Sequence, residues 1–231
     1  MQSPKKALIA ASILLSLAPL CGTAAAQDLK TVLAKLDTAA ANFRSTSANF
    51  EFNTAQTDPV PDTEMQKGVV YYDRKNGALR MGVHIDEVNG KPVPKVIVVA
   101  GGAFQLYEKL TNQVTRSKKA GKYESYLVLG FGASGKDLQE KFDMKYAGSE
   151  IIDGVKTEKL ELVARDPDVL KMFPKITIWV DPARGVSLRQ FFDQGHGQSR
   201  TCTYSNIRIN QPLPSDAFTF KTDSKTQVVN R

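Results

Sequence analysis

The fold of this chain is first visible in the run Gly68-Val-Val-Tyr-Tyr-Asp-Arg-Lys-Asn-Gly-Ala-Leu-Arg-Met-Gly-Val-His-Ile-Asp86. At its centre, Asn76-Gly77 is a dipeptide that reaches positive φ without steric cost, as a tight β-hairpin requires. Apolar and aromatic side chains flank the turn on both sides. We therefore predict two antiparallel strands, residues 68–74 and 78–86.

Similar turn signals recur along the chain, at Asn89-Gly90, Gly101-Gly102 and Asp153-Gly154. Strands joined by hairpins need no crossover helix, so the sheet is expected to be antiparallel. About eleven twisted strands seldom stay flat, and an incomplete barrel with an apolar interior is the expected outcome. The expected strands are residues 49–53, 68–74, 78–86, 95–100, 103–109, 144–152, 155–164, 175–180, 186–192, 199–209 and 217–221.

Helices are expected between some of these strands. Residues 28–45 place Leu29, Val32, Leu33 and Leu36 on one helical face. Shorter helices are expected at residues 123–129, 136–142 and 167–173, and a loop is expected at residues 56–67 because of its two prolines. The fold class is therefore mainly β, with short α-helices over an apolar cavity.

Residues 1–26 have the layout of a secretory signal peptide, with two lysines, an apolar segment and small residues before a cleavage site after Ala26. We therefore expect an exported protein in which residues 27–231 form a single domain. The alternative is a membrane anchor through a lipidated Cys21. A net charge of +7 with 42% hydrophobic and 24% charged residues excludes a disordered chain and a polytopic membrane protein.

The motifs that suggest chemistry are weak. Gly130-Phe-Gly-Ala-Ser-Gly135 with Lys136 is close to a nucleotide-binding loop, but Asp137 stands where a P-loop has Ser or Thr. A nucleotide-dependent enzyme using this loop is the distant alternative to a glycine-rich joint before a helix. His84 and His196 are isolated, and the basic residues are dispersed. We therefore expect no enzyme activity, no cofactor, no metal site and no nucleic-acid partner.

Two stretches resemble a known family. The run Asn206-Ile-Arg-Ile-Asn-Gln-Pro-Leu-Pro-Ser-Asp-Ala-Phe-Thr-Phe220 looks like the closing signature of the periplasmic outer-membrane lipoprotein carriers, the LolA type. The stretch 68–76 is similar to that family's strand that ends in a basic residue, here Arg74. The resemblance covers about residues 28–223.

The resemblance implies an incomplete antiparallel barrel, capped by helices, that carries acylated lipoproteins through the periplasm. Its partners would be an inner-membrane ABC-type release complex and an outer-membrane acceptor, and the carrier would be a monomer. Arg74 would hold the lid closed by hydrogen bonds to lid carbonyls. A lipid- or lipoprotein-sensing regulator and an anchored acceptor remain alternatives on the same fold.

The ligand-binding residues that we predict are apolar side chains on the expected strands, together with Arg74, and the lid candidate is residues 123–131. They are Phe50, Phe52, Arg74, Leu79, Met81, Val83, Val98, Leu160, Leu162, Ile176, Ile178 and Phe192.

Overall fold

The computed structural model describes residues 21–75, 78–118, 126 and 129–231. All of the strands in these ranges belong to one sheet, in the order β12-β6-β5-β4-β3-β2-β1-β11-β10-β9-β8-β7. The strands are β1 (Ser45–Gln56), β2 (Asp62–Lys75), β3 (Ala78–Val88), β4 (Lys91–Ala100), β5 (Ala103–Glu108), β6 (Gln113–Ser117), β7 (Phe142–Ile152), β8 (Val155–Ala164), β9 (Lys175–Asp181), β10 (Val186–Gly195), β11 (Gln198–Ile209) and β12 (Gln227–Asn230).

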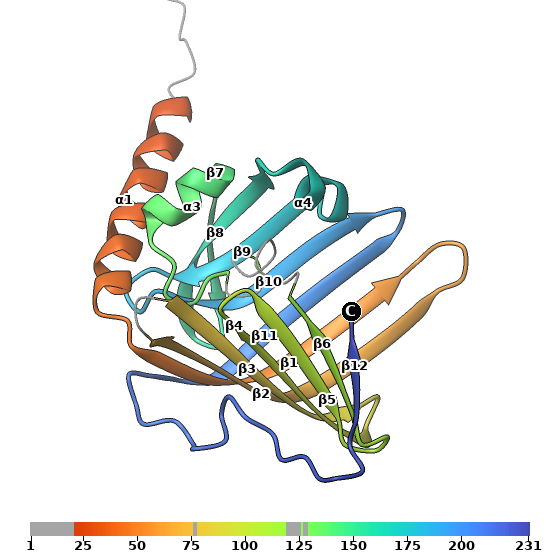
Figure 1. Ribbon diagram of the computed structural model, residues 1–231. Helices are drawn as coiled ribbons and strands as arrows, with labels where there is room; N and C mark the ends of the chain where they lie inside the picture. Colours follow the sequence, from red (N-terminus) through yellow and green to blue (C-terminus); the bar gives the residue numbers. More distant parts are fainter. Residues whose placement is uncertain (1–20, 76–77, 119–125, 127–128) are drawn as a thin grey trace, which may run out of the picture.

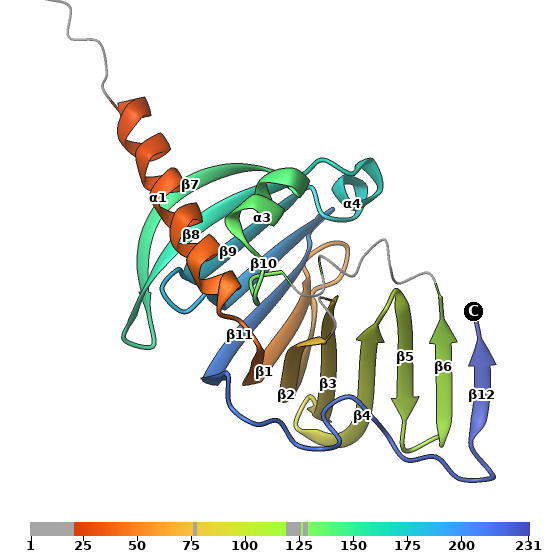
Figure 2. The same cartoon turned by 60° about the vertical axis from the view of Figure 1, so that its left-hand side comes forward.

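The sheet is strongly curved and open, as Figure 1 shows. Every described pair of neighbouring strands is antiparallel except β12, which pairs with β6 in parallel. In Figure 2 the β4, β5, β6 and β12 end forms one wing, and α1 (Cys21–Ala41), α3 (Gly135–Lys141) and α4 (Pro167–Met172) lie beside the β7–β10 wing. The predicted fold class, an incomplete β-barrel with short helices, is confirmed.

The sequence prediction of individual strands needs three corrections. The expected loop 56–67 is shorter, because β2 begins at Asp62 and pairs from there with the end of β1. The expected strand at residues 217–221 does not form. Instead, the short strands β6 and β12 complete the sheet, and neither contains enough alternating residues to be recognised as a strand by pattern alone.

The helices match the expectation in part. The first begins at Cys21 and ends at Ala41, because β1 starts at Ser45 and pairs with two strands. The helices α3 and α4 lie within one residue of the predicted bounds. The expected helix 123–129 lies outside the described residues, apart from Tyr126 and Leu129, and so do residues 1–20 of the expected leader. In the ranges that are described, none of the helices is long and apolar enough to span a membrane.

The hydrophobic core has two clusters, and most of their side chains lie on the concave face of the sheet. The first cluster is built on β1, β2, β3, β10 and β11 and contains Phe50, Tyr72 and Phe131. The second cluster packs α1, α3 and α4 against β7, β8 and β9 and contains Leu33, Leu138 and Leu160. The described helices therefore cover the concave face over β7, β8 and β9 and leave the rest of that face uncovered.

The segment after β11 covers the outer face of the sheet. Ala217 is buried against Gly82, where an added Cβ would collide with the Ala217 carbonyl oxygen. The Arg80 guanidinium lies 4.2 Å from the centre of the Phe218 ring and also pairs with Asp73. This explains why residues 217–221 are apolar without forming a strand, since they pack on strands from outside.

Replacement of Gly82 by alanine tests this packing. We expect Gly82→Ala to displace the segment, to lower stability by about 1–3 kcal/mol through overpacking, and to speed cleavage by trypsin after Lys221, because the chain around this exposed residue is then less firmly held. Limited proteolysis and thermal unfolding measure both effects. The matched control is Gly90→Ala, in open space with a φ of 72°, which should cost about 1–2 kcal/mol through its backbone conformation and leave the rate of cleavage after Lys221 unchanged. Equal cleavage in the two variants would contradict this account.

Candidate functional site

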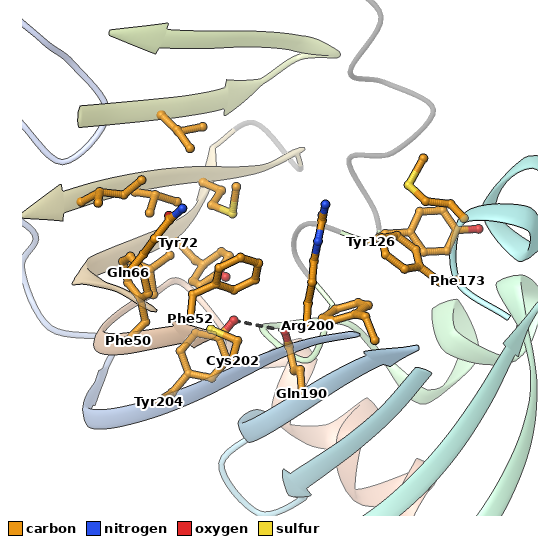
Figure 3. A pocket seen from close by; sticks show the side chains of 17 residues that line it. Phe50, Phe52, Gln66, Tyr72, Tyr126, Phe173, Gln190, Arg200, Cys202 and Tyr204 are labelled. Atoms are coloured by element: carbon orange, nitrogen blue, oxygen red, sulfur yellow. Dashed lines mark hydrogen bonds between the residues drawn. The ribbon is translucent and has the colours of Figure 1, made fainter. Parts of the chain in front are cut away.

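A cavity of about 300 Å³ lies on the concave face between the two wings. Figure 3 shows side chains from β1, β2, β10 and β11 forming its floor and one wall, with Tyr126 and Phe173 opposite. The lining is mostly apolar and aromatic: Phe50, Phe52, Gln66, Val70, Tyr72, Met81, Val83, Ile85, Ile97, Tyr126, Met172, Phe173, Gln190, Phe192, Arg200, Cys202 and Tyr204.

Strand register explains why these side chains meet. In antiparallel pairs, directly opposed residues share a face. Cys202 lies opposite both Gln190 and Phe52, and Phe52 lies opposite Gln66, so this row crosses four strands on the cavity side. Because alternate residues of a strand share a face, the row above and the row below line the same cavity.

Five of the predicted residues line this cavity: Phe50, Phe52, Met81, Val83 and Phe192. Leu79 is partly buried and packs against the first cluster, on the same side as Met81. The structure therefore brings half of the predicted set to one place. Whether they contact a ligand stays a prediction.

Four predicted residues lie on the same concave face but away from the cavity. Leu160 and Leu162 of β8, and Ile176 and Ile178 of β9, are fully buried in the second cluster. The alternation pattern identified their face, because Leu162 lies opposite Ile176 and Ile176 opposite Phe192. The α-helices cover this wing, so these side chains are core rather than cavity lining.

Val98 faces the other way. It pairs directly with Gly82, whose Cβ direction points at the Ala217 segment on the outer face. Its neighbours Ile97 and Val99 pair with Val83 and Met81 on the cavity side. The sequence run Val96-Ile-Val-Val99 is apolar on both faces, so the pattern did not distinguish the two directions.

Several lining residues were missed by sequence reasoning, notably Arg200, Tyr204 and Gln190. The alternation of Arg200, Cys202 and Tyr204 with Thr201 and Thr203 indicates that the first three side chains share one face of the strand. Cys202, expected to be a small packed residue, is indeed buried and contributes its side chain to the cavity.

A glycine-rich segment, residues 130–135, packs against two residues that line the cavity, Tyr72 and Tyr204. Phe131 is fully buried, stacks on the Tyr72 ring at 4.4 Å between centres and meets the Tyr204 ring edge-on at 4.8 Å. A Cβ on Gly132 would lie 2.6 Å from the Phe43 ring, and one on Gly135 would lie 2.6 Å from the Leu33 carbonyl. These glycines are thus accounted for by close packing within the chain.

The start of α3 uses its own side chains as caps. Ser134 Oγ accepts from the Asp137 amide at 3.0 Å, and the Asp137 carboxylate accepts from the Ser134 amide at 3.1 Å. Partial burial acts to raise the pKa of Asp137, but the hydrogen bonds from Ser134 outweigh it and lower that pKa. The predicted position of Asp137 near a helix N-terminus is confirmed.

Arg74 reaches this segment from β2. Its Nη2 donates a hydrogen bond to the Gly132 carbonyl oxygen at 2.8 Å. Arg74 lies opposite Leu79 in the β2–β3 register and so projects on the concave side. One guanidinium therefore ties the glycine-rich segment to β2.

The polar groups in the cavity floor satisfy one another. The Tyr204 hydroxyl donates to Gln190 Oε1 at 3.1 Å, and Gln190 Nε2 donates to the Leu129 carbonyl oxygen. Burial raises the pKa of both Tyr72 and Tyr204 and raises the pKa of the Cys202 thiol to about 12. These groups therefore stay neutral at physiological pH. Within the described residues, no three His, Cys, Asp or Glu side chains gather to hold a metal ion.

Comparisons with known sequences place this cavity in context. No protein-family model matches the chain. It is 29% identical over 144 residues to an outer-membrane lipoprotein carrier protein of Cupriavidus necator, covering 61% of this chain and 63% of that protein. An uncharacterised protein of Methanocaldococcus jannaschii is 29% identical over 125 residues, or 54% of this chain and 35% of that protein. The chain spans less than two thirds of these curated relatives.

Two solved structures share the fold. An uncharacterised conserved protein from Thermus thermophilus aligns with a TM-score of 0.54 and 15% identity, over 89% of this chain and 99% of that one. MucB aligns with a TM-score of 0.51 and 15% identity, over 88% of this chain and 66% of that one. The predicted resemblance is confirmed: this chain resembles the outer-membrane lipoprotein carriers.

Proposed function

We propose that this chain is a carrier that binds the acyl chains of lipoproteins in the cavity and takes them through the periplasm from the inner to the outer membrane. The observation that carries the proposal is the apolar cavity, built on one face of a curved sheet, with a separately attached segment packed beside it. The similarity to an outer-membrane lipoprotein carrier protein supports the cargo class. No cofactor is required for this task.

The cavity volume sets how much lipid the closed state holds. If a methylene takes about the ~30 Å³ of a water molecule, the 300 Å³ of the cavity accommodates about ten methylenes. Burying them is worth roughly 8 kcal/mol gross, at about 0.8 kcal/mol for each CH₂. A lipoprotein carries several longer chains, so we infer that loading requires the cavity to open further.

The attachments of the glycine-rich segment indicate where opening begins. Arg74 holds Gly132 from one side, and the Ser187 amide donates to the Gly130 carbonyl at 2.7 Å from the other. Breaking the Arg74 hydrogen bond would free the glycine-rich segment on the side that faces β2. A closed empty state of this kind opposes overly tight binding, because opening costs free energy that the cargo must supply.

The partners follow from the proposed route. An inner-membrane ABC-type complex would release the cargo to a monomeric carrier, and an outer-membrane acceptor would take it. Mass spectrometry of the native N-terminus separates this from an anchored acceptor, since the carrier would begin at Gln27 and the anchored protein at an acylated Cys21.

Capture of a lipoprotein tests the proposed function directly. We expect the purified chain to retain an acylated lipoprotein and not its unacylated form in a pull-down. Val83→Asp, which places a carboxylate in the apolar cavity, should weaken capture by about tenfold or more. Val163→Asp is the control, because Val163 is 41% exposed on β8 and should leave capture unchanged. Equal capture of both lipoprotein forms would defeat the proposal.

The Arg74 bond is tested by transfer rather than by capture. We expect Arg74→Leu to load cargo normally but to pass it to acceptor membranes more slowly, because the closed empty state that drives release is weakened. Arg208→Leu, an exposed arginine on the outer face of β11, is the control. Transfer at the wild-type rate would remove Arg74 from the mechanism.

Cys202 reports on cavity occupancy. With a thiol pKa of about 12, we expect iodoacetamide at pH 8 to react on the order of a thousandfold more slowly than with free cysteine. The rate should rise about tenfold from pH 8 to pH 9, because both values lie below that pKa. Bound acyl cargo should slow it again. The control is Thr203→Cys in a Cys202→Ser background, which places the thiol on the opposite face of β11, and its alkylation rate should be the same with and without cargo. An alkylation rate at Cys202 that does not change with cargo would contradict binding in the cavity.

A further inference from the structure

Arg200 stands out in the cavity wall as a cation among apolar side chains. It lies on β11 directly opposite Phe192 of β10 and Thr54 of β1, so its side chain shares the concave face with Phe192 and Cys202. Figure 3 shows it extending from β11 between the Phe52 side and the Phe173 side of the cavity. The structure therefore points a guanidinium into the space assigned to acyl chains.

Within the described part of the chain, this cation has no acidic partner. Arg200 Nε is buried and has no hydrogen-bond partner. Among the residues that the structure describes, the ion pairs engage four other arginines, and none includes Arg200. On the same face, Glu64 lies two strands away, and its carboxylate accepts from Gln66 Nε2 at 2.7 Å.

The neighbouring polar groups do not compensate for this charge. The amide of Gln190 is occupied by the Tyr204 hydroxyl and the Leu129 carbonyl, and burial keeps the Tyr204 phenol neutral. A partly buried charge without a partner is unfavourable, and an anion brought by a ligand removes that cost. The guanidinium fork matches a carboxylate or phosphate with two parallel hydrogen bonds.

We propose that Arg200 is a head-group site, and that the cavity selects amphiphiles in which a carboxylate or phosphate is attached next to the acyl chain. The chain would lie against Phe50, Phe52 and Val83 while the acid binds Arg200. This inference rests on the cavity being an acyl-chain site, as proposed above, and names the class of lipid that fits it best. The ester and amide carbonyls of an acylated lipoprotein offer Arg200 only neutral acceptors.

Matched single-chain amphiphiles test the proposal. We compare dodecanoate and dodecyl phosphate below their micelle concentrations with dodecanol below its solubility limit, at pH 8, by calorimetric titration of the full chain. We expect at least one of the two anions to bind about tenfold to a hundredfold more tightly than the alcohol. Preference for dodecanoate identifies a free fatty acid as the source of the acid, and preference for dodecyl phosphate identifies a phospholipid.

Variants assign the preference to this side chain. Arg200→Gln should lose it and bind dodecanol with wild-type affinity, whereas Arg200→Lys should keep part of it because the charge remains. Arg208→Gln, on the same strand but the outer face, is the control and should behave as wild type. We expect the melting temperature of empty Arg200→Gln to be no lower than that of wild type, since the substitution removes an uncompensated charge.

The outcomes separate this inference from the proposed function. Equal affinity of the wild-type chain for dodecanol and both anions would overturn the head-group site and leave the acyl-chain cavity standing. A preference that survives in Arg200→Gln would also overturn it. No binding of any of the three compounds would remove the acyl-chain site itself, and both proposals with it.

Discussion

The structure depends on one constraint: a curved sheet of twelve strands presents an apolar concave face that it does not close by itself. An exposed apolar face of this size is unfavourable in water, so other elements must cover it. On the β7–β9 wing, α1, α3 and α4 do so and produce a filled core. Over β2 and β11, Phe131 and the glycine-rich segment cover only part of the apolar face. The cavity is the part of the concave face that neither the helices nor the glycine-rich segment covers.

The polar groups in the cavity floor make hydrogen bonds to one another, whereas Arg200 Nε makes none. A buried hydroxyl or amide is tolerated when its hydrogen bonds are made, and Tyr204 and Gln190 satisfy this condition with each other and with the Leu129 carbonyl. The resulting floor is neutral, which suits an apolar ligand. Arg200 Nε has no such partner, so the same rule that explains the floor leaves one cation for the ligand to neutralise.

The fold was predictable from local signals, and the site only in part. Turn pairs such as Asn89-Gly90 and Asp153-Gly154, whose residues all have positive φ, located hairpins without reference to distant contacts. The β12–β6 pairing was not predictable, because a parallel partner depends on where the chain returns after crossing the outer face. Alternation identified the concave face for Leu160 and Phe52 alike, but no local pattern tells which wing the helices cover. The sequence did not predict that Arg200 lines the cavity, because a single charged residue in a strand is ordinarily exposed to solvent.

The attachment of the closing segment is weak enough for a carrier. A hydrogen bond from a charged donor such as Arg74 is worth about 1.5–3 kcal/mol, and burying a side chain such as Phe131 about as much again. Together with the hydrogen bond from the Ser187 amide to Gly130, worth about 0.5–1.5 kcal/mol, these contacts amount to roughly 3.5–7.5 kcal/mol. This is comparable with the ~8 kcal/mol gross gain of filling the cavity with methylenes. In the proposed function, cargo would displace the segment, and the segment would re-form when an acceptor offers the cargo a better environment. A helix packed like α1 against the filled wing would oppose that exchange, so in the proposed function the opening lies on the side held by Arg74.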